Sequence, residues 1–166
     1  MELLIVRHAI AFERNAKRWP DDAERPLSPR GMARAGKAAA GLKVIAQRPG
    51  RVLVSPLRRT CQTAAILTER AGWPAAVECP QLLPGAPHDA LLALLKRLPD
   101  KCIALVGHEP GLGRLLEVCL TGSAHGRAFG LKKLGAALLR FPGAARAGGA
   151  QLLWLAPPRM LRALAE

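Results

Sequence analysis

Three short apolar segments of this chain each end in polar residues, and this repeated construction most constrains how the chain can fold. The segments are residues 3–6 followed by Arg7-His8, residues 52–54 followed by Ser55, and residues 102–106 followed by Gly107-His108. Short apolar runs rich in β-branched side chains are typical of buried strands. Ligands bind at the carboxyl edge of open α/β sheets. If the three strands are parallel neighbours, they bring two histidines and several arginines into one cluster that suits an oxyanion.

The rest of the chain alternates helical and extended patterns. Ser28-Pro29 is a helix start, Pro49-Gly50 is a break, and Gly72 suits a helix C-cap. Loops are expected where charge and proline accumulate, at 11–26 and 80–87, and residues 123–135 are expected to be irregular. The predicted helices are 29–47, 56–72, 89–98, 110–122 and a terminal helix from 157, and the further strands are a weak one at 75–79 and a pair at 136–141 and 152–155.

This alternation predicts an α/β fold with a mostly parallel sheet, to which the C-terminal strand pair adds an antiparallel strand at the edge. No internal repeat or linker divides the chain, so residues 1–166 are expected to form a single domain. Half of the residues are hydrophobic, which is enough for a substantial core.

Four segments together resemble the histidine phosphatase superfamily, and within it the small bacterial phosphohistidine phosphatases of the SixA type. The resemblance extends from residue 2 to about residue 122. It implies a phosphoglycerate mutase-like fold, in which helices cover both faces of the central sheet in a three-layer sandwich, and an enzyme that needs no cofactor. The segments are Arg7-His8, residues 25–31 (RPLSPRG), residues 55–64 (SPLRRTCQTA) and Val106-Gly107-His108.

The resemblance implies a role for each motif residue. His8 matches the nucleophile, which forms a phosphohistidine intermediate, and its other ring nitrogen is then expected to donate to a backbone carbonyl. His108 matches the second histidine, which binds the phosphoryl oxygens as a cation. Arg7 and Arg59 are the arginines expected to bind the phosphoryl group, since guanidinium forks suit its oxygens. Arg59 is preferred to Arg58 because the family arginine stands three residues before the Gln-Thr pair; Arg58 is expected at the substrate edge or in solvent.

Two departures leave the general acid unassigned. Ala9 stands where most of the superfamily has Gly, although the phosphohistidine branch varies there, and Gln81 stands near the place where relatives often carry Glu. The remaining candidates for the acid are Glu13, Glu24, Asp89 and Glu109, each of which has an alternative interpretation as a loop charge or a helix-start residue. His88 and His125 lie outside the motifs and are expected at the surface.

The charge balance suggests anionic partners without choosing among them. The chain has 25 Lys+Arg against 12 Asp+Glu and a formal net charge of +13, which is either functional or compositional. Nucleic acid is an unlikely partner, because three Trp, three Phe and no Tyr give no basic-aromatic interleaving. The four cysteines are widely spread and are expected to be reduced thiols. No signal-peptide or membrane-spanning pattern is present, so the protein is expected to be cytoplasmic. The oligomeric state is not predicted.

The main prediction is a metal-independent phosphatase that acts on phosphohistidine in a protein, or on another phosphoramidate. The first alternative is a phosphatase of small phosphomonoesters or acid anhydrides, and the second is a non-catalytic phosphate- or polyanion-binding protein. A metal site formed by His8 and His108 is a further alternative, but carboxylates are few and the neighbouring arginines would repel a cation. Inorganic phosphate or sulfate is expected to fit the site.

Overall fold

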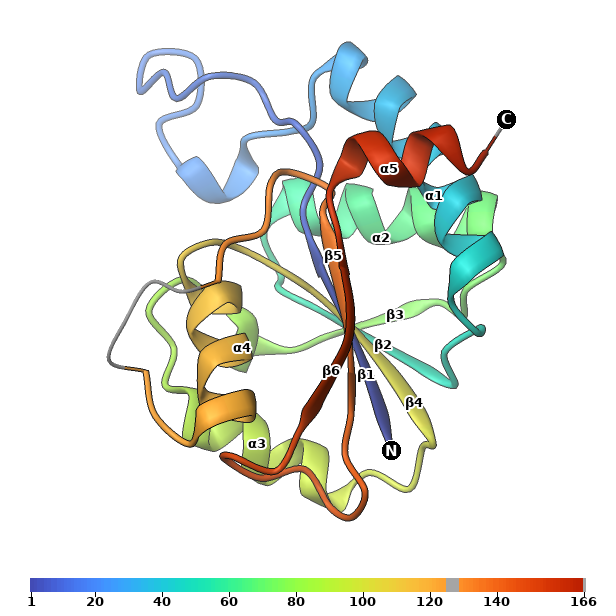
Figure 1. The fold of residues 1–166 in the computed structure, drawn as a ribbon. Helices are drawn as coiled ribbons and strands as arrows, with labels where there is room; N and C mark the ends of the chain where they lie inside the picture. The colour runs from blue at the N-terminus through green and yellow to red at the C-terminus, as the bar shows by residue number, and fades with distance from the viewer. Residues whose placement is uncertain (125–128, 166) are drawn as a thin grey trace.

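The computed structural model describes residues 1–124 and 129–165, and its centre is a six-stranded sheet in the order β3-β2-β4-β1-β5-β6 (Figure 1). Strands β1 to β4 are parallel, β5 runs antiparallel to β1, and β6 runs antiparallel to β5 at the sheet edge. The fold class predicted from the sequence is therefore confirmed, including the antiparallel addition. The strands are β1 (Glu2–Arg7), β2 (Arg51–Val54), β3 (Ala76–Glu78), β4 (Cys102–Gly107), β5 (Ala136–Arg140) and β6 (Gln151–Ala156).

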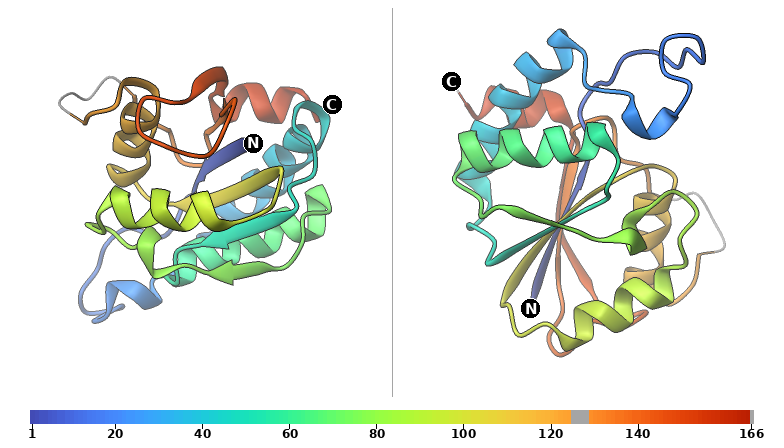
Figure 2. Two further views of the ribbon diagram at one scale, coloured as in Figure 1. Left: turned by 90° about the horizontal axis from the view of Figure 1, so that it is seen from below. Right: turned by 180° about the vertical axis from the view of Figure 1, so that it is seen from behind.

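Helices cover both faces of this sheet (Figures 1 and 2). Successive side chains of a strand point to opposite faces, and β1 shows the consequence. Leu4 and Val6 join a core cluster with α1, α2 and α5, whereas Leu3 and Ile5 join a second cluster with α3 and α4. The result is a three-layer sandwich. The helices are α1 (Pro29–Ile45), α2 (Arg58–Ala71), α3 (His88–Arg97), α4 (Gly111–Thr121) and α5 (Pro158–Ala163), with short 3-10 turns at Asp22–Glu24 and Pro80–Leu82.

Several predicted helix ends are displaced by one to three residues, with local causes. Helix α2 begins at Arg58 and not at Pro56, because Leu57 has extended backbone angles (φ −70°, ψ 139°). The predicted N-cap of α1 is confirmed, since the Ser28 side chain accepts a hydrogen bond from Gly31 N. Helix α1 ends two residues early because Ala46 is extended. Gly72 ends α2 at φ 72°, a left-handed conformation that glycine adopts without strain.

Residues 11–26 form the predicted long loop, and it has internal order. Ala11 makes an isolated antiparallel bridge with Leu27. The rings of Phe12 and Trp19 lie 5.1 Å apart, and the Arg18 guanidinium lies over both.

All four cysteines are free thiols, of which Cys61 is only half-buried. Within the described part of the chain, no helix has the length and apolar character needed to cross a membrane.

Candidate active site

The sheet order places the ends of β2, β4 and β1 side by side, and the motif residues that follow them converge there. His8 N donates to Gly107 O at 3.0 Å, and Ser55 N donates to Val106 O at 3.0 Å, so the parallel ladder continues one residue beyond the strands. The ring centroids of His8 and His108 lie 5.1 Å apart, with a 55° angle between the planes. Two histidines that are 100 residues apart in the sequence thus face one another.

The ring of His8 is held by its Nδ1 atom, which lies 2.7 Å from Ala9 O. A carbonyl oxygen can only accept, so Nδ1 carries the proton and Nε2 retains a free lone pair. Burial lowers the pKa of His8 to about 4, and the nearby charges of Arg59, Arg7 and Lys133 act in the same direction against the hydrogen bond to Ala9. His8 is therefore a neutral imidazole at pH 7, which is the form that can act as a nucleophile.

His108 is buried beside it and uses one ring nitrogen on the protein. Its Nε2 lies 2.9 Å from Ser55 Oγ, while its Nδ1 is buried and has no partner among the described residues. Burial first, and then the charges of His8, Arg59 and Arg7, lower the pKa of His108 to about 3. The charge of Asp22 raises this pKa but is outweighed, so a further negative charge beside the ring would favour the cationic form.

Arg7 and Arg59 each donate one guanidinium N–H group to a backbone carbonyl, while the Nε–H group of each has no acceptor among the described residues. Arg7 Nη1 donates to Leu131 O at 2.8 Å, and Arg59 Nη1 donates to Asp22 O at 2.9 Å. Burial lowers the pKa of both arginines, but an arginine side chain stays charged at neutral pH. The Nε atoms of both side chains are buried and unpartnered within the described part of the chain.

The three unpartnered nitrogens are the main electrostatic feature of the site. Arg7 Nε, Arg59 Nε and His108 Nδ1 are the buried side-chain nitrogen or oxygen atoms that lack a partner among the described residues. Buried polar groups are nearly always hydrogen-bonded, so such atoms require an explanation. All three belong to motif residues at one sheet edge, and two are cationic donors. A multidentate oxyanion is the ligand that would satisfy them together.

The Gln-Thr pair of α2 positions the chain on either side of the site. Ala9 N donates to Thr63 Oγ1 at 3.0 Å, which fixes the peptide that holds His8. Leu27 N donates to Gln62 Oε1 at 2.7 Å, which ties the end of the 11–26 loop to the same helix. These two residues marked the motif register in the sequence, and the structure shows them to be positioning residues.

Two residues at the site were not identified from the sequence, namely Ser55 as the partner of His108 and Asp22 as the partner of Arg59. The Asp22 carboxylate lies 3.3 Å from Arg59 Nη1, 2.7 Å from Arg25 Nε and 3.5 Å from Arg14 Nε. The hydrogen bond from Arg25 is the main reason that the pKa of Asp22 is lowered. The available signal was a short acidic stretch, residues 21–24, inside an otherwise basic loop.

The candidate residues at the periphery are distributed unevenly. Arg58 has a half-exposed side chain, and its Nη1 lies 3.7 Å from the Glu24 carboxylate. Glu109 is the acidic candidate nearest to Arg7 in electrostatic terms, since its charge raises the pKa of that guanidinium. Its two oxygens accept from Leu131 N at 2.8 Å and Gly113 N at 3.3 Å. Glu13, Glu24 and Asp89 are exposed to solvent.

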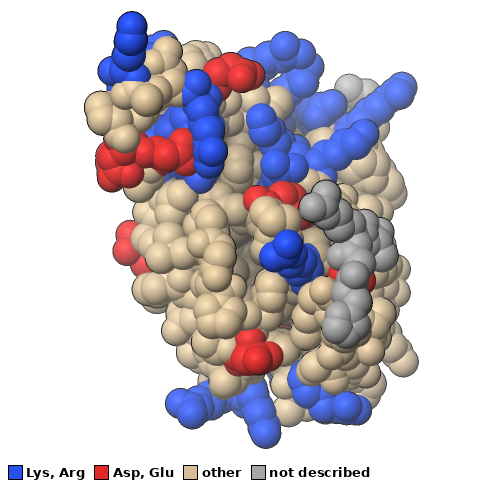
Figure 3. Space-filling model, turned by 90° about the vertical axis from the view of Figure 1, so that its left-hand side faces the viewer, with Lys and Arg blue, Asp and Glu red and all other residues tan. Residues whose placement is uncertain are grey.

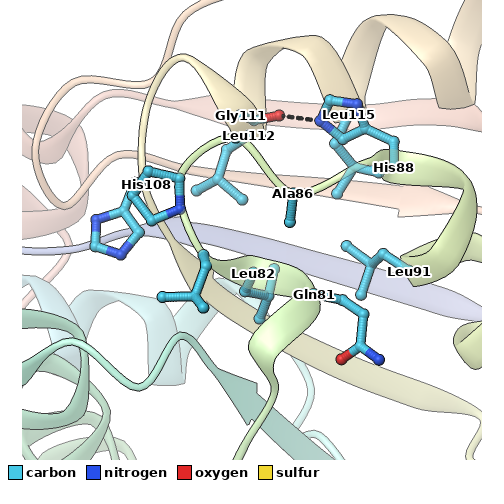
Figure 4. Close-up of a pocket in the computed structure, with 12 residues that line it drawn as sticks. Gln81, Leu82, Ala86, His88, Leu91, His108, Gly111, Leu112 and Leu115 are labelled. Carbon is cyan, nitrogen blue, oxygen red and sulfur yellow. Dashed lines mark hydrogen bonds between the residues drawn. The ribbon is translucent and has the colours of Figure 1, made fainter.

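His88 was expected at the surface, and it is only partly exposed there. It is partly buried, and its Nε2 lies 2.9 Å from Gly111 O, so it links the start of α3 to the start of α4. Figure 4 shows His88 and His108 lining the same small pocket, together with Gln81 and the leucines of α3 and α4. His125 lies outside the described residues. Within the described chain, no three His, Cys, Asp or Glu side chains gather as a metal-binding group.

Comparison with known proteins agrees with this geometry. The family model described as histidine phosphatase superfamily (branch 1) matches residues 3–82. An uncharacterized protein of Picosynechococcus sp. is 38% identical over 149 residues, which is 88% of both chains. The structure of the protein histidine phosphatase SixA complexed with tungstate superposes with a TM-score of 0.83 at 25% identity, covering 97% of this chain and 99% of that one. A Nakamurella multipartitia structure that carries the SixA name gives 0.73 at 26% identity, over 93% of this chain and 94% of that one. The chain belongs to the histidine phosphatase superfamily.

Proposed function

We propose that the protein is a metal-independent phosphatase that removes the phosphoryl group from phosphohistidine in a protein, or from another phosphoramidate. The observation that carries this proposal is the set of three buried, unpartnered nitrogens on Arg7, Arg59 and His108, beside a neutral His8. The SixA structure with tungstate supports it, because tungstate is a tetrahedral oxyanion like phosphate.

The residues divide the reaction between them. Arg7 Nε, Arg59 Nε and His108 Nδ1 bind the phosphoryl oxygens, and the dianion raises the pKa of His108 toward the charged form. His8 Nε2 attacks phosphorus while the bond to the leaving nitrogen breaks, and that nitrogen keeps the bonding electron pair. Water then attacks the phosphorus of phospho-His8, which releases inorganic phosphate and restores the free imidazole. Ala9 O holds His8 Nδ1–H throughout, so the same tautomer serves both steps.

The positions of the acidic side chains determine which leaving groups the site favours. Glu109 is occupied by two backbone N–H groups, and Glu13, Glu24 and Asp89 are exposed. An alkoxide needs a proton as it departs, whereas a protonated imidazole with an ordinary pKa near 6.5 departs as a neutral group. A site without a positioned carboxylic acid therefore favours phosphoramidates and activated aryl phosphates over alkyl phosphates.

The leaving-group prediction is tested by kcat/KM at neutral pH for phosphohistidine, an aryl phosphate and an alkyl phosphate. We expect the alkyl ester to be at least about 100-fold worse than the phosphoramidate, which is the lower range for a missing general acid. Comparable values would show that an acid is present. The variants Glu109→Gln, Glu24→Gln, Glu13→Gln and Asp89→Asn would then identify it.

The covalent step and the metal independence are tested on the same preparation. A rapid quench into base should trap a phosphoenzyme in the wild type that is stable in base and is lost on later acidification, whereas His8→Ala should give none. Excess chelator should leave the rate unchanged, because the two arginines and His108 supply the charge that a divalent ion would provide. Full turnover by His8→Ala, or a chelator loss restored by magnesium or zinc, contradicts the proposal.

A further inference from the structure

A second hollow lies beside the carboxyl end of β1 and is lined by five cationic side chains. It has a volume of about 150 Å³, and its remaining lining is apolar side chains and backbone near Ala9, Gly31 and Leu134. Among the described residues, no acidic side chain lines this hollow. None of the ion pairs in the described part of the chain involves its cations. We call it the basic pocket, and its cations are Arg34, Lys132, Lys133, Arg159 and Arg162.

Three separate segments build the basic pocket, and close backbone contacts hold each of them. The segment before β5 is fixed because Leu134 N donates to Arg7 O at 3.1 Å and to His8 O at 3.2 Å. Helix α5 packs so closely on α1 that a Cβ at Gly41 would stand 1.7 Å from Leu161 O. Gly31 of α1 also lies close to Ile10, since a Cβ added at Gly31 would stand 1.9 Å from Ile10 O. The cations are therefore carried on packed backbone rather than on a free loop.

The basic pocket adjoins the phosphoryl site without sharing its residues. Ala9, which follows His8, lines the basic pocket, whereas the four motif residues of the phosphoryl site do not. The charge of Lys133 is close enough to His8 to lower the pKa of its imidazole. Figure 3 shows many Lys and Arg side chains over the upper part of one face, with some Asp and Glu side chains among them.

This arrangement is selective for an anion for two reasons. Like charges confined around one hollow repel one another, and the repulsion is relieved only by counterions or by a bound anion. The pocket volume is several times the roughly 30 Å³ that one water occupies, so it can admit a carboxylate or phosphate group with bound water. Arg34 and Arg162 are partly buried, whereas Lys132, Lys133 and Arg159 are exposed at the rim, so the pocket is open to an anion from solvent.

We propose that the basic pocket is a second oxyanion subsite, which holds a carboxylate or phosphate group of the substrate other than the phosphoryl group being transferred. This inference rests on the proposed function of the neighbouring site. The oxyanion has two possible sources, an acidic side chain beside the phosphohistidine of a protein or the second phosphate of a small molecule. Its chemistry is the same in both.

The test compares two variants that remove the same charge. The pocket variant is Lys132→Gln/Arg159→Gln/Arg162→Gln, which retains Lys133 because of its influence on His8. The control variant is Lys37→Gln/Lys43→Gln/Lys96→Gln, at three exposed lysines outside the pocket. The substrates are a phosphohistidine peptide flanked by Glu, the same peptide flanked by Gln, phenylene bisphosphate and phenyl phosphate.

We expect the pocket variant to lose about tenfold in kcat/KM only on a substrate that carries the second oxyanion, and to change less than about twofold on its uncharged match. A loss on the Glu peptide identifies a protein carboxylate, and a loss on the bisphosphate identifies a second phosphate. The control variant should treat each matched pair alike. Equal loss on every substrate, or no loss on any, overturns the proposal.

A binding measurement separates this inference from the proposed function. Inorganic pyrophosphate is titrated into the isotope-labelled protein, and the amide resonances of Gly31 and Leu134 are followed. They should shift in the wild type and in His8→Ala, and should stop shifting in the pocket variant. If no substrate is turned over but these shifts occur and depend on the pocket cations, the proposed function fails and the basic pocket stands as an oxyanion-binding site without a role in that reaction. If the shifts are unchanged in the pocket variant, the subsite fails.

Discussion

At the residue scale, the site is defined by which buried groups have partners and which do not. His8 uses Nδ1 on Ala9 O and keeps Nε2 free, and His108 uses Nε2 on Ser55 and keeps Nδ1 free. The motif residues alone suggested the nucleophile and its carbonyl partner. They could not indicate Ser55 or Asp22 as partners, because those contacts depend on how β2 and the 11–26 loop approach the site in three dimensions.

The two adjacent arginines of α2 give a matched test at this scale. Arg59 is buried and its Nε has no partner among the described residues, whereas the side chain of Arg58 is 52% exposed. We expect Arg59→Gln to reduce kcat/KM by about 10²–10³-fold, as for removal of a donor from an oxyanion site, and Arg58→Gln to reduce it less than about threefold. Thermal melts of both variants check that folding is retained. Equal losses in the two variants would contradict the motif alignment that assigns phosphate binding to Arg59 and not to Arg58.

At the element scale, one glycine of α1, Gly31, allows this helix to pack against the segment that follows His8. A Cβ on Gly31 would stand 1.9 Å from Ile10 O, a backbone atom that also accepts hydrogen bonds from Ser28 N and Oγ. The sequence predicted this helix and its N-cap, because Ser28-Pro29 is a local signal. It could not predict the close approach of Gly31, because that contact is made by a segment distant in the sequence.

The substitution Gly31→Ala should therefore destabilise the protein, and Gly36→Ala in the same helix should not. The first forces backbone apart, at a cost of about 1–3 kcal/mol or more in the free energy of unfolding. At Gly36 the nearest atom to an added Cβ is Arg70 Nε at 4.0 Å, so alanine should stabilise the helix by up to about 1 kcal/mol. Urea unfolding measures both. Similar changes at the two glycines would show that α1 is not held against Ile10.

At the scale of the whole molecule, the topology converts three local signals into one site. Each apolar run and its polar ending is readable from the sequence, but the order β2-β4-β1 that makes these strands neighbours is given by the structure. The basic pocket was not predicted, since its cations come from α1, the segment before β5 and α5. The sequence showed only a net charge of +13, with no indication of where that charge would gather.

The burial of both histidines makes the stability of the whole molecule depend on pH. In the unfolded chain an imidazole has its ordinary pKa of about 6.5. In the folded protein burial lowers the pKa to about 4 for His8 and about 3 for His108. Below pH 6.5 the unfolded state therefore binds protons that the folded state does not, and the free energy of unfolding must fall as the pH falls. Above pH 6.5 both states are neutral at these positions, so the effect vanishes.

We expect the free energy of unfolding to be flat from pH 8 to about 7 and to decrease toward pH 4.5. The full loss, about 3 kcal/mol for His8 and about 5 kcal/mol for His108, is reached only below the folded pKa values. Urea unfolding at several pH values across this range measures the slope. The range lies above the pH at which Asp22 titrates, because the pKa of Asp22 is lowered. His8→Gln and His108→Gln should each remove about half of the slope, because glutamine does not titrate. A wild-type slope that persists in the double variant would assign the proton uptake to other groups and contradict the buried, neutral state of the histidine pair.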